Sequence, residues 1–302
     1  AHFQHDSLPW TDAAISGFVL DPDRKKMSKS KGNVVTPMAL LEQHGSDAVR
    51  YWAASARPGV DTAFDEGQMK IGRKLATKLL NVTKFVLGIG DAPAEDDAGL
   101  VALVTEPVDL AMLHRLADLA DEATAAFETY DYARSLERTE ATFWWFCDDY
   151  VELVKGRAYG GHGEEPAASA RAALRLALSA LQRLFAPIIP FATEEVWSWW
   201  RSGSVHGSAW PTSAELRPAV GDPGILDAVC GALGAVRKAK TEAKASMRAV
   251  VERAVVTASA ADLAALTAGL TDLREAGSIA ALDTVEAEGP LRVDVTLAPT
   301  EP

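Results

Sequence analysis

The chain has 302 residues, enough for about two ordinary domains, and 48% of them are hydrophobic, which excludes an intrinsically disordered protein. Its 42 acidic residues outnumber its 30 lysines and arginines and give a net charge of −12, so nucleic acid can bind only where cations are concentrated locally. Two distant cysteines and six histidines without ligand spacing predict neither a disulfide framework nor a protein-bound metal.

The sequence also predicts a compartment. No apolar run reaches the ~18 residues of a membrane-spanning helix, and no charged region followed by an apolar stretch opens the chain. Cys147 and Cys230 are expected to be free thiols in a reducing environment. We expect a cytoplasmic, monomeric protein without a membrane partner.

The first predicted elements are a strand and a basic loop. Residues 15–20 are apolar, with β-branched and aromatic members, which predicts a buried strand, and residues 21–23 predict a turn. Five of the eight residues 24–31 are cationic. Lysine charges, serine hydroxyls and backbone amides in one loop suit a polyphosphate. Two other interpretations fit the same composition: a lysine-rich segment that is merely exposed to solvent, or a surface that binds nucleic acid without specificity.

Short helices are predicted next. Thr36, as N-cap before a proline, begins a helix that ends at Gly45. Ser46 or Asp47 is the expected cap of a second helix, through Ala56. These helices connect the loop to the longer segments that follow.

Four longer helices are then predicted from apolar residues at helical spacing: 65–88, about 107–128, about 131–156 and 166–186. The first has an apolar face made by Ile71, Leu75, Leu79, Val82 and Val86. Residues 91–106 are acidic and contain a proline, so we predict a loop there. Antiparallel-compatible helices with short connections predict a helical bundle.

The remaining residues change character. Glu194 and Glu195 are expected at the start of a short helix, where they favour the helix dipole rather than form an acid/base pair. Residues 224–247 are predicted as a helix. The alternation of residues 291–297 predicts a half-buried strand and thus a small α/β module at the end.

The order of residues in the basic loop narrows its function. Lys26-Met27-Ser28-Lys29-Ser30, continued by Lys-Gly-Asn-Val-Val-Thr-Pro, resembles the second signature of class I aminoacyl-tRNA synthetases. Other segments resemble the connecting helices and the anticodon-binding bundle of the valyl family within that class: 45–52, 64–66, 78–81, 146–153 and 187–197. Isoleucyl and leucyl enzymes share the loop but look less similar around 64–66 and 146–153. The resemblance covers about residues 1–250.

This resemblance implies adenylate formation in protein biosynthesis. The complete enzyme would activate valine with ATP and Mg²⁺ and ligate it to tRNA(Val), with no metal held by this part of the protein. Lys29 would stabilise the transition state directly and Lys26 would assist, while Met27, Ser28 and Ser30 would complete the ATP-binding set. The loop would close over the triphosphate during this step.

The family's first signature, His-Ile-Gly-His or a variant, does not occur in the sequence. We therefore expect the C-terminal part of a longer synthetase, inactive alone. Three alternatives stay open: a free-standing tRNA-binding module descended from a synthetase, the corresponding part of an isoleucyl enzyme, and an interaction protein that uses only its helical bundle.

Two groups of cations are candidate tRNA contacts. The first is a stripe on the first long helix, made by Lys70, Arg73, Lys74 and Lys78, for which a merely solvated face is equally open. The second ends the 224–247 helix and comprises Arg237, Lys238, Lys240 and Lys244. Aromatic residues 143–146 either stack on bases or, as their helical spacing favours, belong to the core.

We predict a mainly α fold in four parts. Residues 1–35 are the remnant of an α/β nucleotide-binding (Rossmann-like) catalytic domain and carry the loop. Residues 36–64 are connecting helices that contact the tRNA stem, and residues 65–222 form the helical anticodon-binding domain. Residues 223–302 form the small α/β C-terminal module.

Overall fold

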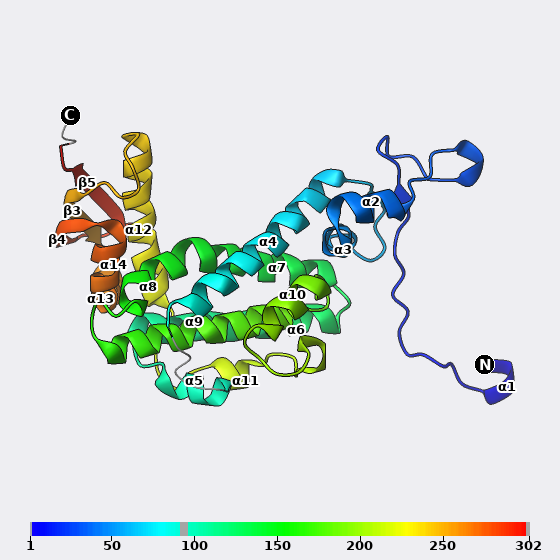
Figure 1. Ribbon diagram of the computed structural model, residues 1–302, viewed down its shortest axis with the longest axis horizontal. Coiled ribbons are helices and arrows are strands. Elements are labelled where there is room, and N and C mark those ends of the chain that lie inside the picture. Colours follow the sequence, from blue (N-terminus) through cyan, green and yellow to red (C-terminus); the bar gives the residue numbers. More distant parts are fainter. Residues whose placement is uncertain (1, 91–95, 300–302) are drawn as a thin grey trace. The chain divides into compact units, whose positions relative to one another are not determined.

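The computed structural model describes residues 2–90 and 96–299, and most of them are helical (Figure 1). The chain divides into two compact units, each described by itself below. The first unit comprises Ala1–Leu80, Glu122–Thr139 and Leu184–Ser208, and the second comprises Asn81–Asp121, Glu140–Arg183 and Ala209–Pro302. None of the helices in the described residues is long and apolar enough to span a bilayer.

The first unit contains short elements and parts of long helices. Its elements are α1 (His2–His5), β1 (Val19–Leu20), the 3₁₀ turn η1 (Lys29–Lys31), α2 (Pro37–His44), α3 (Ser46–Ala54), β2 (Thr62–Ala63), most of α4 (Glu66–Gly88), the end of α6 (Pro107–Glu128), the start of α7 (Tyr132–Trp145), the end of α9 (Glu164–Phe185), α10 (Pro190–Ser198) and the 3₁₀ turn η3 (Val205–Gly207).

A two-residue parallel ladder carries the basic loop. Strands β1 and β2 pair in parallel, and the carbonyl of Phe18 accepts a hydrogen bond from the N–H of Thr62 at 2.9 Å. The predicted buried strand over residues 15–20 is wrong in length and in burial, since only two residues are strand and Ile15 is 74% exposed. The reason is that the strand next to β1 in its sheet, β2, is equally short, and the further pairing of β1 is a single bridge between Leu20 and Lys26.

The connecting helices follow the prediction except at one cap and at the end of the second helix, which is Ala54 and not Ala56. Helix α2 begins after Thr36 and ends before Gly45, as predicted. The N-cap of α3 is Gly45, so the expected cap at Ser46 or Asp47 is wrong. The carboxylate of Asp47 instead accepts hydrogen bonds from the first N–H groups of α10, at 3.1 and 2.7 Å. It thereby satisfies two donors that a helix start leaves unpaired and places a negative charge at the positive end of the helix dipole.

The two glutamates of α10 do not serve that helix start. Helix α10 begins at Pro190 with no acidic residue in its first turn, so the predicted dipole role of Glu194 and Glu195 is wrong. Glu194 accepts hydrogen bonds from the hydroxyl of Ser204 at 2.9 Å and the N–H of Val205 at 3.0 Å. It therefore anchors the loop that follows.

Helix α4 buries a row of apolar side chains, but not quite the predicted row. Leu75 and Leu79 are fully buried as expected, whereas Ile71 is 38% exposed and Met69 is fully buried in its place. Gly72 explains the close approach of α3, because a Cβ there would lie 2.5 Å from the Cβ of Tyr51. Which side chains of α4 are buried therefore depends on the packing of α3 against Gly72 as well as on the helical spacing of apolar residues.

The second unit contains most of the bundle and the C-terminal module. Its elements, beside its shares of α4, α6 and α7, are α5 (Asp97–Leu103), the π-helical segment η2 (Phe146–Tyr150), α8 (Val151–Ala158), most of α9 (Glu164–Phe185), α11 (Ser213–Leu216), α12 (Gly224–Glu242), β3 (Val251–Ala258), α13 (Ala260–Ala268), α14 (Leu270–Gly277), β4 (Ile279–Glu286) and β5 (Arg292–Leu297).

The long helices confirm the predicted segments, while the predicted loop over 91–106 is wrong. Residues 91–95 lie outside the described residues, and Asp97–Leu103 form helix α5. The side chain of Asp96 caps it by accepting from the N–H of Gly99 at 2.7 Å, and Leu100 is buried. The N-cap Asp96 and the buried side chain of Leu100 stabilise a helix in a segment whose acidic composition predicted a loop.

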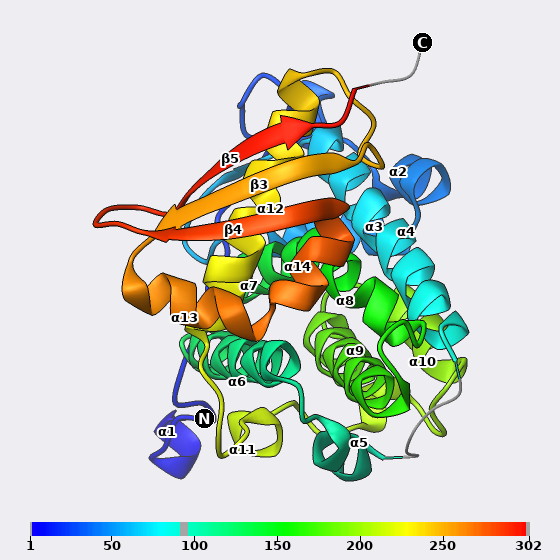
Figure 2. The same ribbon diagram turned by 90° about the vertical axis from the view of Figure 1, so that its left-hand side faces the viewer.

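The C-terminal module is a three-stranded sheet with helices, as predicted (Figure 2). Strand β3 lies in the middle, parallel to β4 and antiparallel to β5, and α13 and α14 make the crossover that a parallel pair requires. Helix α12 packs on one face of this sheet. It ends at Glu242, five residues before the predicted Met247, where Lys244 turns the chain with φ of 53°. The predicted alternation in β5 is confirmed.

A buried ionic cluster joins this module to the bundle helices of the same unit. The guanidinium of Arg157 on α8 binds both carboxylate oxygens of Asp109 at 2.7 and 2.9 Å and those of Asp272 on α14 at 2.9 to 3.2 Å. Tyr150 and Ser169 each donate a further hydrogen bond to Asp109, both at 2.7 Å. We call these five residues the Arg157 cluster.

Candidate functional site

The basic loop between β1 and α2 is closed at its base by two side chains. The carboxylate of Asp21 accepts from the N–H of Lys25 at 2.7 Å and from the Nδ2 of Asn33 at 2.8 Å. The Oδ1 of Asn33 accepts from the N–H of Ser28 at 2.9 Å, and its Nδ2 also lies 3.3 Å from the carbonyl oxygen of Lys26. We call this arrangement the Asp21–Asn33 clasp.

Asp21 is buried, with 6% of its surface accessible, whereas the other residues of the loop are exposed or half-buried. The predicted turn at its position is confirmed, because its carbonyl accepts from the N–H of Arg24 at 2.9 Å. Hydrogen bonds from the Lys25 N–H and the Asn33 amide hold the pKa of Asp21 below its ordinary value. The clasp therefore contains a carboxylate that stays ionised at neutral pH.

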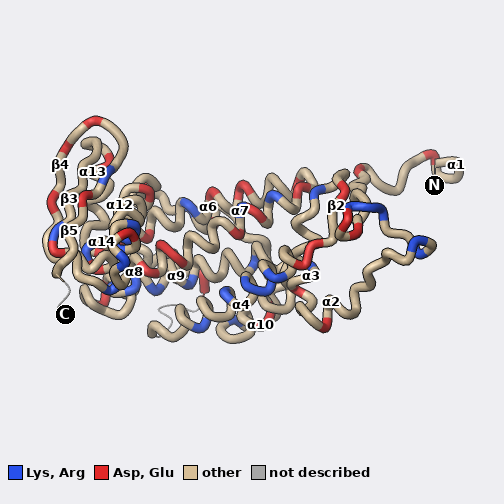
Figure 3. Tube along the Cα trace, turned by 90° about the horizontal axis from the view of Figure 1, so that it is seen from above, with Lys and Arg blue, Asp and Glu red and all other residues tan. Residues whose placement is uncertain are grey.

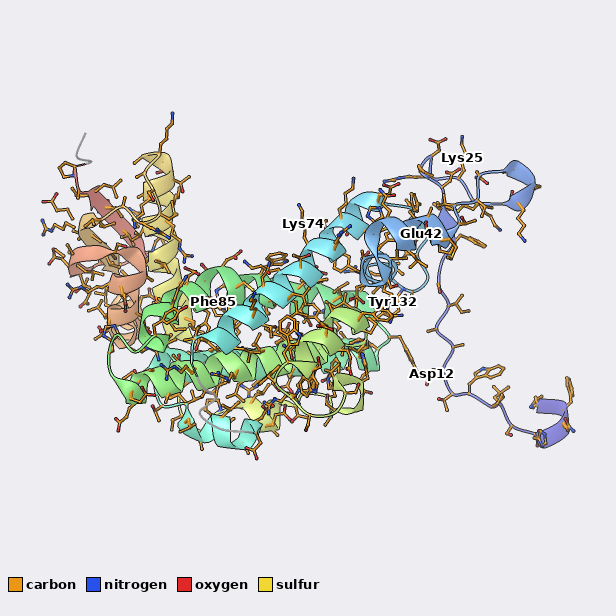
Figure 4. All side chains as sticks on the ribbon, viewed as in Figure 1. Asp12, Lys25, Glu42, Lys74, Phe85 and Tyr132 are labelled. Carbon is orange, nitrogen blue, oxygen red and sulfur yellow. The ribbon has the colours of Figure 1, made fainter. Side chains whose placement is uncertain are left out.

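The lysines and arginines of this loop are blue in Figure 3, and Lys25 is labelled in Figure 4. Of the predicted ATP-contacting residues, Lys26, Lys29 and Ser30 are exposed and Ser28 is half-buried. Lys29 begins the η1 turn and is exposed, and it forms no ion pair with any described residue. The ammonium of Lys26 lies 3.9 Å from the ring centroid of Phe18. The hydroxyls of Ser28 and Ser30 are 3.2 Å apart. Met27 is half-buried. Free cations next to hydroxyl groups suit a polyphosphate that arrives from solvent.

The predicted stripe on α4 is divided by the structure. Lys70 and Lys74 are exposed and form no ion pair with a described residue, and Lys74 projects away from the ribbon (Figure 4). The guanidinium of Arg73 donates to the carbonyl of Gln43 at 3.0 Å, and Lys78 is half-buried. Lys70 and Lys74 are thus exposed without an ion pair to a described residue, whereas Arg73 is exposed but hydrogen-bonded and Lys78 is partly withdrawn from solvent.

The predicted cluster at the end of α12 is also divided. Lys240 is 1% exposed, and its ammonium donates to the carbonyls of Met247 and Gly277, both at 2.9 Å. Burial also lowers the pKa of Lys240. Because this side chain cannot reach an RNA phosphate, the prediction that Lys240 contacts tRNA is wrong.

The other members of that cluster differ in how far they are committed to partners. Arg237 donates to the carboxylate of Asp149 at 2.8 Å and is half-buried. Lys238 pairs with Glu242 at 3.8 Å on the surface, and Lys244 is exposed. Lys238 and Lys244 are the two that remain accessible to an anion.

The aromatic run at the π-helical segment is mainly core, as its spacing favoured. Phe143 and Phe146 are fully buried, so base stacking by these two is excluded. The guanidinium of Arg115 lies 4.0 Å from the ring centroid of Trp145. Trp144 is half-buried and donates its Nε1–H to Glu140 at 3.1 Å.

Two further predictions concern thiols and metals. Both cysteines are free, and burial raises the pKa of Cys230 to about 12, so it is a protonated thiol and not a nucleophile. Among the described residues, no group of three or more His, Cys, Asp or Glu side chains is arranged to hold a metal ion.

A cavity of about 310 Å³ lies beside α3, lined by Arg50, Ala53, Ala54, Phe127, Tyr132, Pro187 and Ile188. The guanidinium of Arg50 donates to the carbonyl oxygens of Pro187 at 2.7 Å and Ile188 at 3.1 Å. This arginine therefore holds the chain after α9 in place, and the rest of the lining offers a ligand mostly apolar contacts.

Sequence reasoning missed Asp21 and Asn33 as parts of the site. Both flank the basic loop, but a turn aspartate and an asparagine after a glycine carry no separate signal. Only the folded loop shows that the two side chains meet.

Comparisons with known proteins agree on both ends of the chain. Residues 1–65 match the family described as tRNA synthetases class I (I, L, M and V), and residues 109–255 match the anticodon-binding domain of tRNA ligase. The chain is 58% identical to a valine–tRNA ligase of Thermobifida fusca over 100% of this chain and 34% of that protein. It is 55% identical to a valine–tRNA ligase of Salinispora tropica, over 98% and 36%.

The chain spans about a third of the length of these relatives. Among solved structures, a LeuRS–tRNA–LeuAMS ternary complex of Agrobacterium radiobacter K84 matches with a TM-score of 0.52 and 20% identity, over 68% of this chain and 24% of that chain. At that identity the likeness concerns the fold alone.

Proposed function

Because this chain belongs to the class I aminoacyl-tRNA synthetases and is homologous over its whole length to the C-terminal part of valine–tRNA ligases, we propose that the complete enzyme activates valine with ATP and Mg²⁺ and ligates it to tRNA(Val). The observation that carries this proposal is an intact Lys26–Ser30 signature in which both lysines are exposed and neither forms an ion pair with a described residue. The present part supplies the ATP loop and anticodon binding and is inactive alone.

In the proposed reaction a carboxylate oxygen of valine attacks the α-phosphorus of ATP, and the bond to pyrophosphate breaks. Negative charge increases on the α-phosphate and on the leaving oxygens. Lys29 stabilises this charge and Lys26 assists, because preorganised cations act most strongly where charge develops in the transition state. Met27, Ser28 and Ser30 are the further contacts of the loop with ATP.

For tRNA we propose two cationic surfaces within the four-part division at residues 1–35, 36–64, 65–222 and 223–302. The exposed pair Lys70 and Lys74 leads the first surface, with Arg73 and Lys78 beside it. Lys238 and Lys244 lead the second, with Arg237 at its edge. In an acidic chain, such local groups are where the phosphate attraction has to come from.

The role of the loop is tested in a chimera. The 302 residues replace the corresponding third of the Thermobifida fusca enzyme, with which they are 58% identical, and valine-dependent pyrophosphate exchange is measured. Lys29→Ala is expected to slow exchange about 100-fold, since removing one such group costs about 3 kcal/mol of transition-state stabilisation. Valine binding should change little.

Lys25→Ala is the matched control for this experiment. It removes the same charge from the same loop, but its ammonium already lies 3.6 Å from the carboxylate of Asp23. A small effect is expected. Equal rates for Lys29→Ala and the unaltered chimera would refute the assignment of Lys29.

Binding of tRNA is tested with the chain as it stands. We expect tRNA(Val) to bind more tightly than tRNA(Ile), with an affinity that falls steeply with salt. The double change Lys70→Gln and Lys74→Gln should reduce the slope of log K against log salt by about 1 to 2, since each lost phosphate contact removes ~0.7–0.9. Arg253→Gln with Arg292→Gln, on the exposed strands of the C-terminal sheet, is the control. If the slope of log K against log salt is the same in the double lysine variant as in the unaltered chain, α4 does not contact the tRNA and this part of the proposal is wrong.

A further inference from the structure

The Asp21–Asn33 clasp joins positions that are 12 residues apart, directly at the two ends of the signature loop. Asn33 uses both sides of its amide, since Nδ2 donates to Asp21 at 2.8 Å while Oδ1 accepts from the N–H of Ser28 at 2.9 Å. The second oxygen of Asp21 accepts from the N–H of Lys25 at 2.7 Å. Three hydrogen bonds therefore fix both ends of the loop through one carboxylate and one amide.

The signature residues differ from the clasp in burial. Asp21 is buried and Asn33 is half-buried, whereas Lys26, Lys29 and Ser30 are exposed. The clasp thus constrains the base of the loop and leaves the cations of its tip accessible. Such a constraint matters because ordering a flexible loop costs conformational entropy. If the loop is not ordered beforehand, that cost reduces the free energy of ligand binding or raises the barrier of the reaction.

Lys26 gains a defined position from the same arrangement. Its carbonyl oxygen lies 3.3 Å from the Nδ2 of Asn33, and its ammonium lies over the ring of Phe18 at the start of the ladder. One of the two proposed cations is therefore held from its backbone and from its side chain. Lys29 follows it after Ser28, whose N–H is the last group that the clasp binds.

We propose that Asp21 and Asn33 are positioning residues for adenylate formation, which hold the two ends of the loop together so that Lys26 and Lys29 reach the triphosphate as a preformed pair. This inference rests on the proposed function of the loop. The two side chains touch no substrate and act through the backbone of the signature. Their loss should lower the rate of the chemical step more than it raises the KM for valine.

The hydrogen bonding has a direction, which allows a swap experiment. In Asp21→Asn, two amide NH₂ groups face each other with no acceptor between them, and in Asn33→Asp, two carboxylates face each other. In the double swap the Nδ2 of residue 21 donates to a carboxylate at residue 33, which still accepts from Ser28. The Oδ1 of residue 21 still accepts from Lys25. The weak contact with the carbonyl of Lys26 is lost, and a carboxylate oxygen takes the place of the donor that lay 3.3 Å from it, so the rescue is expected to be incomplete.

The experiment uses the chimera described above and measures kcat and KM for valine-dependent pyrophosphate exchange. Each single change is expected to lower kcat about tenfold, as the loss of about one hydrogen bond would, with the KM for valine little changed. The double swap should return kcat to within about threefold of the unaltered chimera, since it restores all but one contact. Single changes without effect, or a double swap as slow as the singles, would overturn the proposal.

A second measurement makes the result independent of catalysis. Amide hydrogen exchange in the 302-residue chain should be faster at Lys25 and Ser28 in each single variant and return to slow exchange in the double swap. Lys29→Ala separates the two proposals: if it leaves exchange of pyrophosphate unchanged, the function of the loop fails, while the amide measurement still tests the clasp. If Lys29→Ala slows the reaction and the clasp variants do not, the clasp proposal alone fails.

Discussion

The Asp21–Asn33 clasp and the Arg157 cluster are both built on aspartate, yet they place charge in opposite ways. In the clasp, the carboxylate binds neutral donors, and the cations of the neighbouring loop stay exposed. In the Arg157 cluster, two carboxylates bind one guanidinium, and all three groups are buried. Charges left unpaired at a surface are available to a ligand, whereas charges paired in the interior are available only to each other.

The difference also concerns what each network holds. The clasp joins two ends of one local loop and needs only neighbouring residues. The Arg157 cluster joins α6, α8 and α14, and its partners lie 48 and 115 residues from the arginine. The local network closes the base of the basic loop, and the long-range network fastens the C-terminal module to the bundle helices of the same unit.

The largest effect should follow from removing the buried arginine. Arg157→Met leaves Asp109 and Asp272 buried without their cation, and such uncompensated charges cost about 3–5 kcal/mol. We expect that loss in the free energy of unfolding, measured by urea denaturation of the 302-residue chain. Arg253→Met breaks the exposed pair with Asp283 and should cost less than about 1 kcal/mol. Similar losses in both variants would contradict a special role for the buried cluster.

A smaller loss is expected from the buried lysine that sequence reasoning assigned to RNA. Lys240→Met removes the donor from two backbone carbonyls and should reduce the free energy of unfolding by about 1–3 kcal/mol. Lys244→Met, on the exposed turn, is the control for stability. For tRNA binding at low salt the order should be reversed: Lys244→Met should lower the affinity, and Lys240→Met should leave it nearly unchanged. A loss of tRNA affinity in folded Lys240→Met alone would contradict its structural role.

The smallest expected effect is on the pH dependence of stability, because the pKa values of Asp21 and Asp272 are shifted in opposite directions. Hydrogen bonds from Lys25 and Asn33 lower the pKa of Asp21 from 3.8, so its stabilising contribution is complete above that value and is lost as pH falls through the lowered pKa. Burial raises the pKa of Asp272 above 3.8, against the opposing effect of Arg157. Between 3.8 and the raised value, folding takes up a proton, so stability falls as pH rises through that window. Carboxyl-carbon NMR should titrate Asp272 before Asp21 on acidification. The reverse order would refute this comparison.

Local sequence patterns were sufficient to predict the long bundle helices, the final strand and the signature loop. Apolar residues at helical spacing gave α4, α6 and α9 close to their observed bounds, and alternation gave β5. These features depend on neighbours within a few residues, which is why a local pattern reveals them. The Lys26–Ser30 signature belongs to the same class, because its order of residues is a local property.

The folded structure was needed to show which charged residues stay exposed and which are committed to partners within the fold. Lys238 and Lys240 lie in the same basic run, but Lys240 points inward to two carbonyls from other parts of the chain. Asp47 sits at a helix start in the sequence and serves a different helix in the fold. A polar side chain finds its partner through contacts far apart in sequence, and burial then makes an unpaired group costly. A local pattern holds neither piece of information.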